Sequence, residues 1–467
     1  MTTCTEAAAA WLLAFSHDEL PEDVRAATKL RLLDVLGLAL AASSTRFGAA
    51  TAKAVAAMGG SGRSRTLPAG QATSPELAAF STGALSQALQ FDDTHNETII
   101  HISSPNVAAG LALAEAEGLR GAETLLAVAL GNELTCRFGL VAPGRFHKNG
   151  FHPSGIFGTL GATCTAARLL DLDEAETVSA LGIAGSFASG LIECWTDGTD
   201  TQFLHPGWSA QAGIKAARMA RAGFTGPATV LEGRFGLFAS HVQDSGVRLD
   251  FARATADLGR TWESRETSFK PYPTAHIIHP FLDAAFRLHR EHGIDPAAIA
   301  GVECRVAAYA TGVMCEPVAE KVDPPNDTRA RVSLQWSVAE ALSLGRLDGH
   351  AYAPESLANP AIRDLARRVR YTIDPDAPGT ERYKGWVIVE MKDGRRLEWV
   401  QEHNHGSLAD PMTPAEIGTK FADNAARALP PERLPRIVEA VDALDGAPGV
   451  GGLIDLCIWA PGAGSGR

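Results

Sequence analysis

The chain has 467 residues, of which 45% are hydrophobic and 21% charged, and its formal net charge is −12. This composition excludes a disordered chain, and the length indicates two domains. The acidic balance, with no basic run, argues against nucleic acid or an anionic membrane surface as a partner. We find neither a signal peptide nor the run of about 20 apolar residues that a transmembrane helix needs, so we expect a cytoplasmic location. The seven cysteines are scattered without a CxxC pair, which argues against disulfides and a structural zinc site.

The first half of the chain has helical spacing of its apolar residues. Ser74-Pro75 reads as an N-cap followed by a first-turn proline, and Ser104-Pro105 repeats this signal. Many helix positions hold Gly, Ala or Ser, which favours a bundle with close helix crossings. The predicted helices span 6–17, 22–43, 48–58, 74–91, 104–117, 121–139, 153–170, 174–190 and 206–222.

The middle of the chain has a mixed pattern. Residues 301–310 alternate and are rich in β-formers, and β-like runs at 386–391 and 396–401 flank Asp393-Gly394, a strong hairpin signal. Helical segments are predicted near 279–291, 331–344, 358–368 and again in the tail at 413–445. We therefore predict a mostly α protein: a helical domain at 1–265, an α+β domain at 266–404, and a C-terminal segment at 405–467 that returns to the helical domain, with a flexible end at 460–467.

A first segment with chemical potential lies between two predicted helices, at 90–105. It holds Asp92, Asp93, Thr94, His95 and His101. Carboxylates beside imidazoles can tune a histidine for proton transfer near neutral pH. The alternative is an acidic loop whose aspartates cap helices.

Two further histidines stand before prolines at expected helix starts. His152 precedes Pro153, where free backbone N–H groups suit a carboxylate ligand and the helix dipole lowers a histidine pKa. His205 precedes Pro206, with Gln202 just upstream. In each case a simple cap or turn is the alternative.

A fourth segment, at 268–280, holds Lys270 before two prolines, followed by His276 and His279. The prolines stiffen the backbone, so the lysine could clamp a carboxylate; the alternative is an exposed lysine on a turn. No HExxH, GxGxxG after a strand, or P-loop occurs, so we expect neither a catalytic metal nor a nucleotide cofactor.

Together these segments resemble the MmgE/PrpD family, whose members dehydrate, decarboxylate or epimerise small carboxylates. The resemblance covers nearly the whole chain in the family order. It rests on FDDTH at 91–95, a histidine-serine segment at 101–105, GFHPSGIFGTLGA at 150–162, HPGWSAQAGIKAA at 205–217, GFTGP at 223–227, LEGRFGLF at 231–238, KPYP at 270–273, VSLQWSVAEAL at 332–342 and DPMTPAEIGTKF at 410–421.

The resemblance implies a large helical domain, a smaller α+β lid, and a site in the cleft between them. It also implies a cofactor-free enzyme that forms a homodimer. By position, the family's site residues match Thr94, His101, His152, Lys270 and His279.

Three positions depart from the family pattern. Gln90 stands where the decarboxylase branch has an acid, Gln202 where a lysine is common, and Trp336 where a tyrosine is frequent. The first loop also reads HISSP in place of HPS. Loss of a lysine removes a positive charge from the expected pocket, so we infer a substrate with fewer carboxylates than citrate-like acids, or one bound differently.

The reactions implied by the resemblance share the movement of a proton next to a carboxylate, which needs a base and cationic groups. We assign proton transfer to His101 and His152, carboxylate binding to Lys270, and orientation of a histidine to Asp93. Supporting substrate contacts are expected from Thr94, Gln202, His205, His276, His279 and Trp336. A dehydratase-type lyase acting on a small hydroxycarboxylate is favoured; an epimerase or isomerase, a decarboxylase, and a catalytically silent binding protein stay open.

Overall fold

Several helices of the first half lie where the sequence predicts them. In the computed structural model, which describes residues 2–459, α2 (Glu22–Ser43) and α6 (Gly121–Gly139) have the predicted bounds, and the Ser74 hydroxyl caps α4 (Pro75–Gln87). The other long helices of this part are α1 (Cys4–Ala14), α3 (Arg46–Met58), α5 (Ser103–Glu117), α8 (Pro153–Leu169), α9 (Glu174–Phe187) and α11 (Thr201–Arg221). Shorter pieces are α7 (Arg145–Lys148), α10 (Cys194–Asp197), α12 (Leu237–Val242), α13 (Ala252–Thr255), β1 (Ser64–Arg65) and β2 (Ala72–Thr73).

Two predicted helix starts are wrong. Ser104 is not an N-cap, because α5 begins one residue earlier and the Ser104 hydroxyl donates to Asp92 instead. Pro206 lies inside α11 and does not open it, since Asp200 is the N-cap residue. As the sixth residue of α11, Pro206 has no N–H to donate to the carbonyl oxygen of Gln202, so the start of this helix lacks one backbone hydrogen bond.

Small residues let the helices cross closely, as the sequence indicates. At the crossing of α4 and α11, a Cβ added to Gly207 would lie 2.4 Å from the Phe80 carbonyl oxygen. Such a separation is a steric clash, so a larger residue at position 207 would push the two helices apart. This crossing fixes α11, which carries Gln202 and His205, against the bundle.

The α/β part is built on a four-stranded sheet with the order β6-β5-β7-β8. Strand β5 (Ile299–Val306) runs parallel to β6 (Val369–Ile373) and antiparallel to β7 (Gly385–Met391), which forms the predicted hairpin with β8 (Arg396–Gln401). Helix α14 (His279–His292) packs on β7, β8 and α18 (Leu334–Leu344). Short helices complete this part: α15 (Thr311–Met314), α16 (Val318–Val322), α17 (Asp327–Ala330), α19 (Pro354–Leu357) and α20 (Pro360–Ala366).

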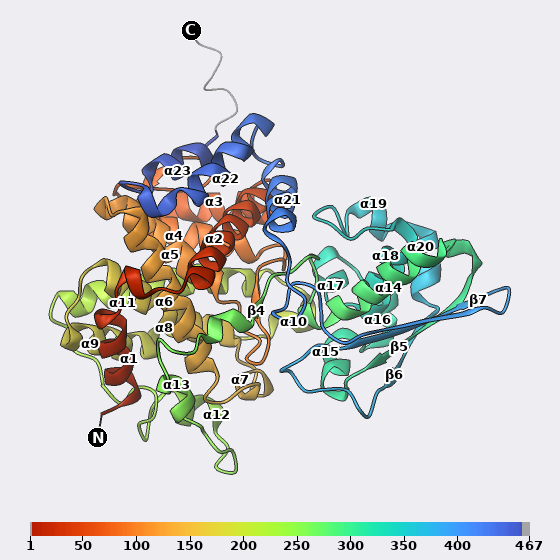
Figure 1. The fold of residues 1–467 in the computed structure, drawn as a ribbon, viewed down its shortest axis with the longest axis horizontal. Helices are drawn as coiled ribbons and strands as arrows, with labels where there is room; N and C mark the ends of the chain where they lie inside the picture. Colours follow the sequence, from red (N-terminus) through yellow and green to blue (C-terminus); the bar gives the residue numbers. More distant parts are fainter. Residues whose placement is uncertain (1, 460–467) are drawn as a thin grey trace, which may run out of the picture.

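The C-terminal segment packs on the first half of the chain. Helix α21 (Pro414–Ala425) lies against α2, with α22 (Leu434–Asp442) and α23 (Gly451–Cys457) beside it (Figure 1). Phe421 joins the apolar cluster around α2, and Lys420 forms a buried ion pair with Asp34 at 2.7 Å. The predicted flexible end at 460–467 lies outside the described residues.

A two-stranded sheet joins distant parts of the chain near the junction of the helical and α/β parts. Strand β3 (Thr94–His95) pairs antiparallel with β4 (Thr267–Ser268), with Thr94 opposite Ser268. The predicted mostly α fold class is confirmed. No helix among residues 2–459 is long and apolar enough to cross a membrane.

Candidate active site

A cavity of about 590 Å³ opens beside the β3–β4 pair. The helical part supplies one side of it, and the loop after β4 together with the α/β part supplies the other. The predicted site residues that line it are Thr94, Gln202, His101, Lys270 and His276. Its other lining residues are Gln87, Gln90, Ile99, Gly144, His147, Lys148, Ile192, Trp195, Ala275, Ile277, Tyr309, Ala310, Val313, Val332, Thr380 and Tyr383.

The ring of His101 has a fixed orientation. Its Nδ1 lies 2.9 Å from the Asp93 carbonyl oxygen and 3.4 Å from the Thr94 hydroxyl. A carbonyl oxygen can only accept, so Nδ1 donates its proton to it and Nε2 carries the free lone pair when the ring is neutral. A neutral histidine held in this tautomer is a competent general base.

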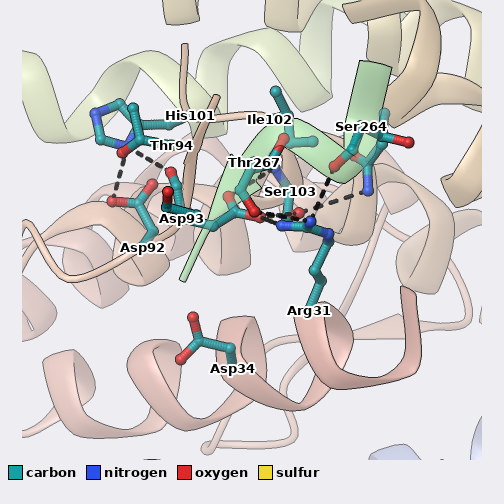
Figure 2. Close-up of polar contacts among 12 residues, drawn as sticks. Arg31, Asp34, Asp92, Asp93, Thr94, His101, Ile102, Ser103, Ser264 and Thr267 are labelled. Atoms are coloured by element: carbon teal, nitrogen blue, oxygen red, sulfur yellow. Dashed lines mark hydrogen bonds and ion pairs between the residues drawn. The ribbon is translucent and has the colours of Figure 1, made fainter. Parts of the chain in front are cut away.

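The carboxylate beside His101 belongs to Asp92, and Figure 2 shows the two side chains facing each other. Asp92 Oδ1 lies 3.2 Å from His101 Nδ1, and the Ser104 hydroxyl donates to Oδ2 at 2.9 Å. Burial acts to raise the pKa of Asp92, but His101 and Lys270 outweigh it and hold that pKa below its ordinary value. Asp92 therefore stays ionised and can stabilise an imidazolium on His101.

The Asp93 side chain does not orient a histidine, contrary to our expectation. Its carboxylate pairs with Arg31 at 2.7 Å and accepts from the Ser103 hydroxyl at 2.5 Å (Figure 2). Arg31 also donates to the carbonyl oxygens of Ser264, shortly before β4, and of Thr267, the first residue of β4. Only the backbone carbonyl of Asp93 bonds His101, so its side chain joins the first loop to the β4 segment.

Lys270 is brought to the cavity by the β3–β4 pair, because it follows the paired residue Ser268 by two positions. Its ammonium donates to the Gln90 carbonyl oxygen at 3.1 Å, and the side chain is buried. Burial lowers the pKa of Lys270 to about 8, against the opposing charge of Asp92. The ammonium is therefore mostly charged at neutral pH and can bind a carboxylate in the cavity.

His152 and His205 form a pair one layer behind the cavity wall. Their Nδ1 atoms are 2.8 Å apart, so one must donate and the other accept. Burial, reinforced by neighbouring histidines, lowers the pKa of His152 well below its ordinary value, and burial lowers the pKa of His205 to about 4. Both rings are neutral at physiological pH, and the His152 ring centre lies 6.1 Å from that of His101.

His276 lines the cavity and its ring is held in one tautomer. Its Nε2 lies 2.9 Å from the Asn404 amide nitrogen, which can only donate, so the ring proton sits on Nδ1. That Nδ1 is buried and has no partner among the described residues. Burial lowers the pKa of His276 well below its ordinary value, so the ring stays neutral. His276 therefore brings a buried donor without a partner close to the cavity.

Three predicted substrate contacts do not line the cavity: His205, which lies behind its wall, His279 and Trp336. His279 is buried at the start of α14, with Nε2 3.4 Å from the Thr274 carbonyl oxygen. Trp336 is buried in α18, and its indole N–H donates to Glu340 at 2.9 Å. Trp336 belongs to the apolar core of the α/β part, and the His279 ring packs against Tyr272 and His276, so neither side chain lines the cavity.

The sequence reasoning missed several lining residues. His147 has a buried Nδ1 without a partner, Gln87 has an unpaired side-chain amide, and Trp195 donates to Gln202 at 2.6 Å. His147 and Trp195 lie on short helices that carry no periodic signal, and Gln87 ends α4 without a motif around it, so only the tertiary structure reveals these three. Among residues 2–459 we find no group of three or more His, Cys, Asp or Glu side chains arranged to hold a metal ion.

Comparisons with known proteins agree with the resemblance seen in the sequence. Family models of the MmgE/PrpD N-terminal and C-terminal domains match residues 6–250 and 272–445. A cis-aconitate decarboxylase-like protein of Aspergillus oryzae is 26% identical over 465 residues, covering 96% of this chain and 95% of that protein. The cis-aconitate decarboxylase of Aspergillus terreus is 25% identical, covering 96% and 94%, and that of Mus musculus is 25% identical, covering 79% and 76%.

Proposed function

Because the chain belongs to the MmgE/PrpD family, we propose that it is a dehydratase-type lyase that acts on a small carboxylate bearing a hydroxyl at the β-carbon. The observation that carries the proposal is the meeting of two groups in one cavity. His101 has its Nδ1 proton fixed and Nε2 free, and Lys270 is a buried cation. A base and a carboxylate-binding cation are the two requirements for removing a proton next to a carboxylate.

In the proposed reaction, His101 Nε2 takes the proton from the α-carbon while Lys270 binds the carboxylate. The negative charge that develops on the carboxylate side is stabilised by the Lys270 ammonium. The electron pair then forms the α,β double bond as the β-hydroxyl leaves as water, taking up one proton. The products are an unsaturated carboxylate and water, so the balance needs neither an oxidant nor a cofactor.

Asp92 and His152 have supporting roles in this proposal. Asp92 lies 3.2 Å from His101 Nδ1 and stabilises the imidazolium that forms when Nε2 is protonated. His152 lies behind the cavity wall, so we assign it support of the His101 ring, and the proton that His101 Nε2 has taken up goes to the leaving hydroxyl. Thr94 helps to hold the His101 ring.

The proposal is tested by proton exchange at the α-carbon of 3-hydroxycarboxylates in deuterated water, followed by NMR, with the unsaturated product measured by its absorbance. We expect exchange and elimination with at least one acid, and loss of both in His101→Asn. Exchange of the α-proton without elimination would indicate an epimerase and not a lyase. No exchange with any acid, although an acid binds, would show a catalytically silent protein.

Decarboxylation is a second candidate, favoured by the activity named for the relatives from Aspergillus terreus and Mus musculus. It would release CO2 from an unsaturated polycarboxylate, and the carbanion that remains would take up a proton. Release of labelled CO2 from cis-aconitate would favour this reaction. The Gln90 side chain, where the decarboxylase branch has an acid, lines the cavity and leads us to place dehydration first.

We further propose that the protein is a cytoplasmic homodimer. The family resemblance supports the dimer. Light scattering coupled to size-exclusion chromatography would give twice the chain mass if this holds, and the mass of one chain if it does not.

A further inference from the structure

The cavity holds few positive charges for its size. Among its described lining residues, the only lysines are Lys270 and Lys148, and there is no arginine. The Lys148 side chain is 65% exposed and lies 4.0 Å from Asp244, so it stands at the solvent side. Burial keeps the pKa of His147 at about 4 and that of His276 well below its ordinary value, so neither adds a charge at neutral pH. One buried cation remains, Lys270.

Apolar side chains form much of the rest of the wall. The helical part contributes Ile99, Ile192 and Trp195, and the other side contributes Ile277, Val313 and Val332. Pockets of about 300–1,000 Å³ bury drug-sized ligands, and at about 590 Å³ this cavity is in that range. A polycarboxylate would leave its additional charges against apolar groups, which is costly, whereas an alkyl or aryl group would remove them from water.

The apolar wall is held in place by specific polar contacts. The Trp195 indole N–H donates to the Gln202 side-chain oxygen at 2.6 Å. Across the junction, the Arg329 guanidinium on α17 donates to the backbone carbonyl oxygens of Trp195 and Thr196. Gln202 therefore uses its acceptor to fix an indole ring, and the amide adds no charge to the cavity.

We infer that the substrate is a monocarboxylate with an apolar tail, whose carboxylate binds Lys270 and whose tail packs along Trp195, Ile192 and Ile277. The inference that such an acid is the substrate rests on the proposed function. The inference that such an acid binds rests on the cavity alone. Gln202 and Trp195 are then specificity-determining residues that favour a tail over a second carboxylate.

The test compares kcat/KM for elimination among 3-hydroxybutanoate, 3-hydroxyhexanoate, 3-hydroxyoctanoate and 3-hydroxy-3-phenylpropanoate with the values for malate and citrate. Each added methylene should raise kcat/KM by about three- to fourfold while the tail stays in the cavity. Values for malate and citrate should be at least about tenfold below that of the best tailed acid. Equal or higher values for malate or citrate would overturn the inference.

Two variants probe the wall directly. Trp195→Ala should reduce the rise in kcat/KM with each added methylene. Trp208→Phe, a control on the outer side of α11, should leave that rise unchanged. Gln202→Lys places a cation in the wall and removes the acceptor for Trp195, so it should shift the ratio of kcat/KM values toward malate. An unchanged chain-length dependence in Trp195→Ala, together with an unchanged ratio of kcat/KM values for malate and the tailed acids in Gln202→Lys, would overturn the inference.

Binding of octanoate, measured by thermal shift and by tryptophan fluorescence, separates this inference from the proposed reaction. If octanoate binds in the wild type and more weakly in Trp195→Ala, but no acid shows α-carbon exchange, the inference holds and the proposed function fails. If malate or citrate is eliminated while octanoate does not bind, the proposed function holds and the inference fails.

Discussion

The two sides of the cavity differ in how their side chains are held. On the helical side, His101 is fixed by the Asp93 carbonyl and Asp92, and Asp93 in turn pairs with Arg31. On the α/β side, Ile277, Val313 and Val332 contribute apolar surface. The groups assigned to chemistry therefore lie in a hydrogen-bonded network, whereas the surface assigned to recognition is mainly shape and apolar area. Substitutions in the hydrogen-bonded network around His101 should change kcat, and those of apolar lining residues on either side should change KM.

The largest effect is expected on the helical side. His101→Asn removes the proposed base, so kcat for α-carbon exchange should fall by about 10²–10⁴-fold. The exposed His292 at the end of α14 provides a matched control, since His292→Asn should keep the wild-type rate. A decrease below tenfold in His101→Asn, with the fold intact by circular dichroism, would remove His101 from the base role.

The next effect concerns the cation at the boundary of the two sides. Lys270→Met should raise KM by about 10- to 150-fold, because a charge-assisted hydrogen bond contributes about 1.5–3 kcal/mol. Since burial places the pKa of Lys270 at about 8, the wild-type ammonium loses its proton as pH rises past 8, and kcat/KM should fall there. That decrease should be absent in Lys270→Met. Lys392→Met, on the exposed turn of the β7–β8 hairpin, is the control.

Asp92 and Asp93 provide a comparison within one loop. Asp92→Asn should lower kcat roughly tenfold or more, because His101 loses the charge that stabilises its imidazolium. It should also move the basic limb of the kcat/KM profile to lower pH, since Asp92 raises the pKa of Lys270. Asp93→Asn leaves Arg31 without its buried partner, which costs about 3–5 kcal/mol and should appear as a lower Tm.

The roles assigned to Asp92 and Asp93 would be reversed by the opposite pattern. If Asp93→Asn changed the pH profile at unchanged Tm while Asp92→Asn only destabilised the protein, the carboxylate that acts on His101 would be Asp93. The measurements are thermal unfolding and pH-dependent exchange on both variants.

The smallest effect is expected on the α/β side. Ile277→Ala removes apolar surface from the cavity wall, so KM for a tailed acid should rise by about three- to tenfold with kcat unchanged. Steady-state kinetics with 3-hydroxyoctanoate measures both constants. A change in kcat without a change in KM would mean that the α/β side takes part in the chemistry.

Much of the fold could be predicted because its signals are local. Apolar periodicity predicted α2 and α6, and Asp393-Gly394 predicted the hairpin, since these signals depend on residues close in the chain. The helix starts predicted at Ser104 and Pro206 were wrong because neighbouring residues decide whether a helix begins before or after such a signal.

The site could be predicted only where a motif matched. Thr94, His101 and Lys270 lie together as expected. Asp92 and Asp93 are equivalent in sequence, and only the contact of Asp93 with Arg31, 62 positions away, separates them. Whether Trp336 and His279 reach the cavity depends on which face of a helix meets the core, and a single sequence does not reveal that face.

The return of α21 to the helical part has a consequence during synthesis. Lys420 pairs with Asp34 across 386 positions, and Phe421 completes the apolar cluster around α2. While a ribosome is still translating the α/β part, this apolar face of α2 lacks its cover, and exposed surface of this kind favours aggregation or chaperone binding. The helical part therefore reaches its final state only after the α/β part has been made, although most of its residues come first.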